Sequence, residues 1–170
     1  MTIRTTLDKP YLKRPFRPLY GWTQMTPKAM LLDPAWDRSV NIWPGMVAMK
    51  TTGDNVTLIN GTGVPYGFFG EYIGGDGIDE PLLRGINTMT VWVLDDGGEA
   101  EVLSPSFDTT LTWTDPGNGT LLLAYAYTTG ANRGRLCLSG TSGATSKPVA
   151  RVLKIATNKL VVGGLSPIDT

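Results

Sequence analysis

Four acidic side chains near the middle of the chain come nearest to a catalytic arrangement. They are Asp95, Asp96, Glu99 and Glu101. Two carboxyl groups can hydrolyse a glycosidic bond when they face each other across a cleft, about 5 to 10 Å apart, and when apolar surroundings raise the pKa of one of them. Here the acids surround Gly97 and Gly98, which predict a turn joining strands 88–94 and 99–103 into a hairpin. Because a hairpin tip is open to water, we interpret the acids as a solvated turn.

The other residue types leave little room for catalysis or metal binding. The chain has no histidine, which excludes Ser-His-Asp and Cys-His nucleophiles and every metal site that needs imidazole. The loop 74–81 is rich in acids and glycines, but it lacks the spacing and the closing glutamate of an EF-hand. Cys137 lies in the alternating segment 135–139, where we expect a buried, unreactive thiol. We therefore predict no enzyme, and no catalytic, cofactor-binding or metal-binding residue.

Composition and turn spacing predict an all-β protein. The chain has 170 residues with 21 glycines and 12 prolines, which suit short strands and tight turns better than helices. Short apolar or alternating runs recur at the spacing of a barrel or sandwich. They include residues 46–50, 55–59, 65–69, 88–94, 99–103, 121–128, 150–156 and 159–162. We expect a small antiparallel β-barrel, or a β-tulip-like domain, over residues 42–170, and no membrane span, since no run approaches ~20 apolar residues.

Residues 1–41 have a different character. Half of the 12 prolines lie in the first 44 residues, which excludes long helices and predicts an extended N-terminal arm, with room for a short helical turn at 28–32. The arm is also rich in aromatic residues, which disordered tails lack. Such an arm is expected to dock on its own barrel, on another copy or on a different protein, and the residues leave these three surfaces open.

Charge is unevenly distributed although the net charge is zero. Residues 1–40 hold seven Lys/Arg against three acids (+4), residues 41–120 two against eleven (−9), and residues 121–170 six against one (+5). Either the two ends of the chain fold over the middle, or basic and acidic parts meet on different molecules. Basic residues alternate with aromatic ones around Lys13 and Arg17, but this modest charge does not favour nucleic-acid binding.

Strands and turns follow one another in a characteristic order between residues 42 and 108. The order is Pro44-Gly45-Met46-Val47, two strands, the Gly61/Gly63 turn, Gly67-Phe68-Phe69-Gly70, and the strand pair that contains Thr90-Val91-Trp92-Val93 and Glu101-Val102-Leu103. This pattern resembles the head decoration (cement) proteins of tailed bacteriophages. The chain differs from the smallest members in its long aromatic arm and in about fifty β-rich residues after Asp115.

The resemblance implies a compact antiparallel barrel or β-tulip whose arm runs over the capsid lattice, and it implies no chemistry. Its partners would be the major capsid protein and other copies of itself, with a trimer favoured over a dimer, and neither nucleic acid nor membrane. The protein would be made in the host cytoplasm and reside on the capsid surface of the virion. The arm residues expected to contact a neighbouring capsid or decoration subunit are Arg14, Phe16, Arg17, Tyr20, Trp22 and Trp36.

Two other functions fit the same composition. A carbohydrate-binding β-sandwich would place aromatic rings on one open face as a stacking platform; the candidates are Trp92, Trp113, Tyr125 and Tyr127. A tail or baseplate module of a phage would share the β-rich composition and occupy another part of the virion.

Overall fold

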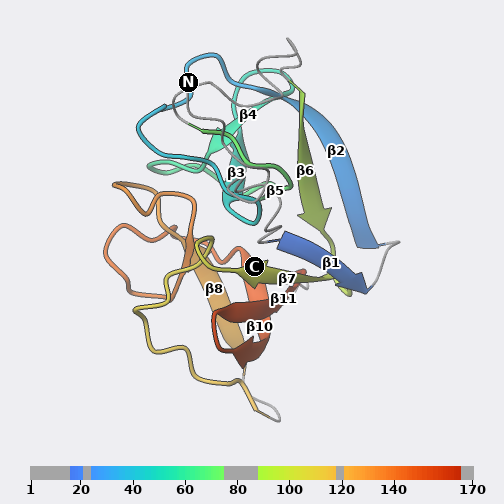
Figure 1. The fold of residues 1–170 in the computed structure, drawn as a ribbon, viewed down its shortest axis with the longest axis vertical. Helices are drawn as coiled ribbons and strands as arrows, with labels where there is room; N and C mark the ends of the chain where they lie inside the picture. The colour runs from blue at the N-terminus through green and yellow to red at the C-terminus, as the bar shows by residue number, and fades with distance from the viewer. Residues whose placement is uncertain (1–15, 21–23, 75–87, 118–120, 166–170) are drawn as a thin grey trace, which may run out of the picture.

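The computed structural model describes residues 16–20, 24–74, 88–117 and 121–165, and within them the backbone of Tyr20 without its side chain. These residues form strands and turns with no α-helix, so the predicted all-β class is confirmed (Figure 1). No helix among them is long and apolar enough to span a membrane. The strands are β1 (Phe16–Tyr20), β2 (Met25–Leu32), β3 (Val47–Lys50), β4 (Asn55–Leu58), β5 (Gly67–Phe69), β6 (Thr88–Leu94), β7 (Glu99–Leu103), β8 (Leu122–Ala126), β9 (Leu136–Cys137), β10 (Ala150–Ala156) and β11 (Lys159–Gly163).

The strands are arranged in two sheets, and the prediction of one antiparallel barrel over residues 42–170 is wrong. Five strands close on themselves in the order β2-β4-β3-β5-β6, and the other six form an open sheet in the order β1-β7-β11-β10-β8-β9. Pairing is antiparallel except between β2 and β4, which run parallel. Figure 1 shows the five-stranded ring above the six-stranded sheet. We call these two units the ring and the open sheet.

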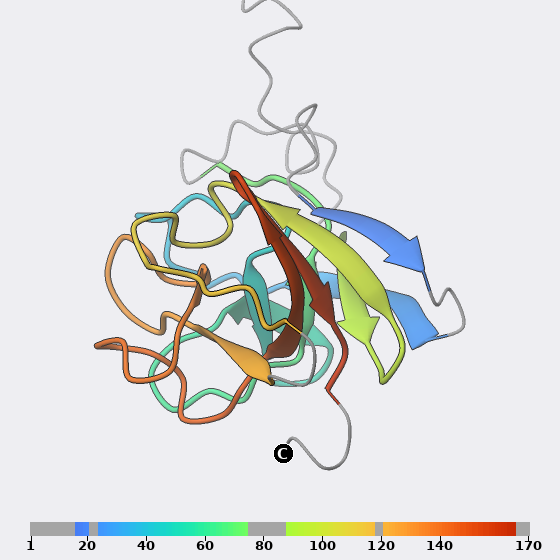
Figure 2. The same ribbon diagram turned by 90° about the horizontal axis from the view of Figure 1, so that it is seen from below.

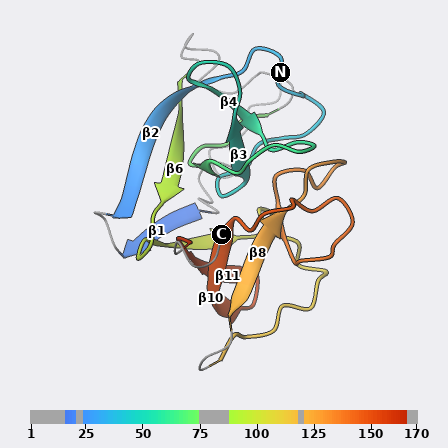
Figure 3. The ribbon, with the colours of Figure 1, turned by 180° about the vertical axis from the view of Figure 1, so that it is seen from behind.

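The turn at residues 95–98 is a corner between the two units. The sequence predicted that this turn joins two paired strands into a hairpin, and that prediction is wrong. β6 pairs with β2 and β5 in the ring, whereas β7 pairs with β1 and β11 in the open sheet. Glycine is required at the corner because a Cβ on Gly98 would lie 2.7 Å from the backbone oxygen of Gln24. Figure 3 shows β6 leaving the ring beside β2 and the chain turning into the sheet.

Both strands within residues 1–41 belong to these sheets. β1 pairs with β7, and β2 pairs with β6 from Met25 to Leu31. The short helical turn allowed at residues 28–32 is therefore wrong, because this segment is strand with Met30 and Leu32 buried in the ring. Figure 2 shows β1 lying alongside β7 at one edge of the open sheet.

Two apolar clusters hold the fold together. One fills the ring and includes Met89, Val91 and Phe69. The other joins the ring to the open sheet, since Val47 and Phe68 of the ring pack with residues of β7, β8, β10 and β11. Apolar burial at about 25 cal/mol per Å² is the main force favouring such packing, so the two sheets share one continuous interface.

Candidate interaction surfaces

β1 is fastened to the open sheet by a buried carboxylate. Glu101 in β7 is 8% exposed, and its two oxygens accept from Lys159 Nζ at 2.7 Å and from Arg17 at 2.7 Å. The hydrogen bond from Lys159, together with the charges of both cations, lowers the pKa of Glu101 despite its burial. Because Arg17 is in β1 and Lys159 in β11, one carboxylate ties three neighbouring strands. Residues 1–15 therefore precede a strand that is anchored at the edge of its own sheet.

The six arm residues expected at a subunit contact fall into three groups. Phe16 and Trp36 are each 6% exposed, and the Phe16 ring stacks on Phe68 at 5.5 Å between centroids. Arg17 is largely exposed and bonded to Glu101 as described above. Tyr20 ends β1 without a described side chain, and Arg14 and Trp22 lie outside the described residues. The structure thus buries two of the aromatic side chains in the protein's own core, and contact with another subunit stays a prediction.

A second polar cluster was not found from the sequence. The carboxylate of Asp108 accepts from Tyr127 Oη at 2.6 Å and from both the backbone N–H and the hydroxyl of Thr110, while its backbone oxygen accepts from Trp113 Nε1 at 2.8 Å. Burial alone would raise the pKa of Asp108, but the hydrogen bonds from Tyr127 and Thr110 outweigh it, and the pKa is lowered. This cluster fastens the loop after β7 to the segment after β8. The Asp108–Thr110 turn is a recognisable local motif, but nothing in the sequence points to Tyr127 as its partner.

Tyr127 and Cys137 lie close to this carboxylate and are poorly placed for chemistry. Burial, reinforced by Asp108, raises the pKa of the Tyr127 phenol, so it stays protonated and donates. Burial likewise raises the pKa of the Cys137 thiol to about 12. Since the thiolate is the nucleophile in cysteine chemistry, this thiol has the properties of a core residue.

The four acids of the 95–101 segment do not form a facing pair. Asp95 and Asp96 are exposed in the corner turn. Glu99 and Glu101 alternate with the buried Ala100 on β7 and so point to the same face of one strand. The pKa of Glu101 is lowered, whereas a general acid in glycoside hydrolysis needs a raised pKa. No group of three or more Asp, Glu, Cys or His side chains that could hold a metal ion occurs among the described residues.

The four rings proposed as a carbohydrate platform do not form an open face. Trp92 and Trp113 are partly buried against the cluster that joins the ring to the open sheet. Trp113 also packs edge-on against Phe107 at 6.0 Å, and Tyr127 is bonded to Asp108. Trp92, Trp113 and Tyr127 are therefore engaged within the protein itself, and Tyr125 is half-buried.

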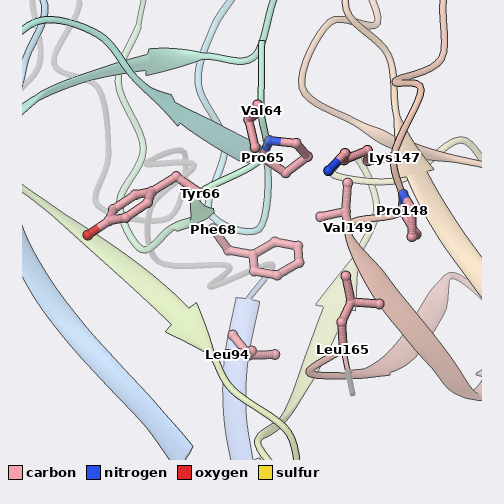
Figure 4. A pocket seen from close by; sticks show the side chains of 10 residues that line it. Val64, Pro65, Tyr66, Phe68, Leu94, Lys147, Pro148, Val149 and Leu165 are labelled. Atoms are coloured by element: carbon pink, nitrogen blue, oxygen red, sulfur yellow. The ribbon is translucent and has the colours of Figure 1, made fainter. Parts of the chain in front are cut away.

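An apolar pocket opens where the ring meets the open sheet, as Figure 4 shows. Its volume is about 260 Å³, close to the lower limit of about 300 Å³ for small-molecule sites. The lining comes from β5 and the segment before it, the end of β6, the segment before β10 and the segment after β11. The residues are Val64, Pro65, Tyr66, Gly67, Phe68, Leu94, Lys147, Pro148, Val149 and Leu165. Such a pocket can accept one apolar side chain, but it lacks the convergent polar groups that orient a cofactor.

The described surfaces thus offer contact area and anchored strands, and no reactive centre. A model of the phage cement protein family matches residues 2–166. The chain belongs to the phage cement protein family. Comparison with curated proteins and with solved structures gave no match.

Family membership confirms the resemblance found in the sequence and extends it. The sequence pattern covered residues 42–108, whereas the family match also includes nearly all of the arm and the β-rich residues after Asp115. The cement protein is accordingly a structural protein of a bacteriophage capsid.

Proposed function

We propose that this cement protein binds the outside of an assembled phage capsid and bridges neighbouring capsomers, with its N-terminal residues as the tie. The observation that supports this most is the extent of the family match, which begins at residue 2 and so includes residues before β1. The major capsid protein and other copies of the chain, as a trimer, are the partners we propose. In this role the protein is made in the host cytoplasm and acts without catalysis or a cofactor.

The structure supports two different roles for residues within 1–41: some anchor the segment in the protein's own core, and others are left for contact with a capsid subunit. Phe16 and Trp36 are buried and serve as anchors. Arg14, Tyr20 and Trp22, together with the exposed side of Arg17, are then the arm residues proposed to contact a capsid subunit. Fifteen residues precede β1, and when fully extended they span at most about 50 Å. Their prolines reduce the conformational entropy lost on docking, which favours binding by an extended segment.

A cement protein of this kind stabilises the shell by mass action. A ligand that binds only the assembled lattice stabilises it by RT ln(1 + [L]/Kd). The gain therefore depends on a site formed by neighbouring capsomers and on no chemical step. Extended ties suit this task because they reach across a seam and need little regular structure of their own.

The test is deletion of residues 1–15, which leaves Phe16 and both anchored strands in place. We expect the shortened protein to keep its circular dichroism spectrum and melting temperature but to lose co-sedimentation with expanded capsids. Arg14→Glu should weaken decoration in the full chain, whereas Lys28→Glu, which reverses an exposed lysine on the ring, serves as its matched control. Of the proposed contact residues this deletion removes Arg14 alone. Full occupancy of capsids by the shortened protein would refute the assignment of the tie to residues 1–15.

A further inference from the structure

The apolar pocket between the ring and the open sheet has walls from both units (Figure 4). Val64, Pro65 and Phe68 line it from the ring, and Val149 and Leu165 line it from segments that flank β10 and β11. Val64 is 67% exposed, whereas Pro65, Val149 and Leu165 are half-buried. An apolar side chain that enters the pocket would therefore cover residues of both units at once, and burial of such surface is favourable.

A single charged residue, Lys147, belongs to the pocket lining. It is exposed, and Figure 4 shows its amino group directed toward Pro65 on the opposite wall. Lys147 has no ion-pair partner among the residues that the structure describes. The pocket therefore suits an occupant that carries an apolar side chain with a carboxylate next to it.

The chain itself supplies a segment of this kind beside the pocket. Leu165 forms part of the wall and is the last residue that the structure describes. Residues 166–170 follow it with the sequence Ser-Pro-Ile-Asp-Thr. Ile168 is three residues from the wall, a length of chain that spans at most about 10 Å. Ile168 and Asp169 are thus within reach of the pocket and of Lys147.

Covalent attachment favours this segment over any free competitor. The backbone N–H of Gly164 donates to the oxygen of Gly98 at 2.9 Å, so residues 166–170 start from a fixed point of the fold. A short tether of this kind gives a local concentration in roughly the millimolar range. Pro167 also reduces the conformational entropy that the segment loses on docking.

We propose that residues 166–170 close the pocket of their own molecule, with Ile168 inside it and Asp169 paired with Lys147. We call this segment the C-terminal latch, because it follows a strand of the open sheet and covers Val64 of the ring. Since Lys147 is exposed, its ion pair with Asp169 is weak and sensitive to salt, and burial of Ile168 supplies most of the contact. The latch goes beyond the proposed capsid binding and does not depend on it.

The experiment measures how fast a thiol reagent labels a cysteine placed in the pocket of the full-length protein. Val149→Cys places this probe beside the open sheet. Pro65→Cys places it on the ring, as a second probe if circular dichroism shows the first variant to be unfolded. The native Cys137 is fully buried and adds little background.

Deleting residues 166–170 should raise the labelling rate of the Val149→Cys probe about three- to tenfold, because a tethered contact at roughly millimolar local concentration is closed most of the time but not always. Leu121→Cys is the matched control. Leu121 is 58% exposed and lies outside the pocket lining, so its labelling should not change with the deletion.

Point substitutions separate the apolar contact from the ion pair. Ile168→Ala should raise labelling of the probe nearly as much as the deletion does. Asp169→Lys and Lys147→Glu should each raise it less, and the double variant should return it close to the starting rate at low salt, because the exchange restores attraction. Lys28→Glu, which reverses an exposed lysine on the ring, should change nothing.

The other outcomes overturn the latch. Equal labelling rates with and without residues 166–170 show that the segment does not close the pocket. Protection that increases with protein concentration assigns the pocket to the segment of a second copy, and protection that arises only on capsids assigns it to the capsid protein. A double variant that does not recover overturns the pairing of Asp169 with Lys147. A protein that shows the protection in solution but does not bind capsids refutes the proposed function and leaves the latch standing.

Discussion

Replacing Phe16 by alanine tests whether the first strand belongs to the protein's own core. The Phe16 side chain is 6% exposed, and its ring stacks on that of Phe68 with an interplanar angle of 20°. Its backbone is paired with Val102, which is fully buried. Truncating a buried phenylalanine to alanine typically costs about 3 to 5 kcal/mol, of which part is the loss of apolar burial and part is the cavity.

We expect Phe16→Ala to lower the free energy of unfolding by about 3 kcal/mol, at the lower end of this range. The reason is that β1 is an edge strand, paired only with β7, and an edge can relax into a cavity more easily than a central strand. Single domains are stable by about 5 to 15 kcal/mol, so the variant should still be folded at room temperature.

Equilibrium unfolding in urea, followed by tryptophan fluorescence, measures this loss. Val64→Ala is the control, because Val64 is 67% exposed and surface truncations usually stay within about 0.5 kcal/mol. A loss below about 1 kcal/mol for Phe16→Ala would contradict the burial of Phe16 and return this residue to the part of the arm that is available for contact with other subunits.

Three further predictions concern the buried polar groups. Tyr127→Phe should lower the free energy of unfolding, measured in urea, by about 1.5 to 3 kcal/mol, because it removes a hydrogen-bond donor from the Asp108 carboxylate. The pKa of Tyr127 is raised in the fold. The wild type should therefore lose stability above about pH 10, and the variant should lose less. Glu101→Gln should reduce the fall in melting temperature between about pH 7 and pH 3, because the lowered pKa of Glu101 contributes stability that is present above about pH 4 and is lost as the carboxylate is protonated. Cys137 should react with a thiol reagent in urea but not in buffer, since burial raises its pKa to about 12; rapid labelling of the native protein would contradict this.

Local patterns predicted most strands after residue 42, because these patterns depend on neighbouring residues, whereas β1 and β2 were not predicted. Residues 88–94 alternate in sequence, and in the structure Met89 and Val91 are buried at alternate positions of β6. The turn at Thr157 and Asn158 also forms as expected, with Ala156 paired to Lys159 and Asn158 at φ 58°. Asparagine tolerates this left-handed conformation better than most residues.

Pairing between strands was less predictable because it depends on residues far apart in sequence. The glycines at 97 and 98 correctly predict a reversal of the chain, but a tight turn does not specify whether the next strand stays in the same sheet. Likewise, Pro27 would be expected from sequence alone to interrupt a strand, because proline has no backbone N–H to donate. It is tolerated because this part of β2 pairs only with β6, while the pairing with β4 is confined to Leu31 and Leu32.

The contacts of the arm residues were also not predictable from the sequence, because they too depend on residues far away along the chain. Aromatic side chains on an extended, proline-rich segment indicate a docked surface, but they do not specify the partner. The structure places Phe16 against Phe68 and buries Trp36, whose ring lies 5.7 Å from the Arg38 guanidinium carbon. The Asp108–Tyr127 bond joins residues 19 positions apart, and no spacing rule connects them.

Because β1 is held in the open sheet, the proposed attachment to the capsid can be lost in two ways. The proposed tie depends on two contacts: β1 must stay paired in the open sheet, and the residues around it must stay bound to the capsomer. The tie fails when the weaker of these two contacts is lost. Deleting residues 1–15 removes Arg14 and the residues around it from the outer end and should leave stability unchanged. Phe16→Ala should weaken the inner end and leave all the proposed contact residues in place. If both ends matter, Phe16→Ala should decorate capsids normally at room temperature and dissociate at a lower temperature than the wild type, in line with its lost stability. Dissociation at the wild-type temperature would indicate that β1 does not carry the attachment and that another surface of the protein holds it on the shell.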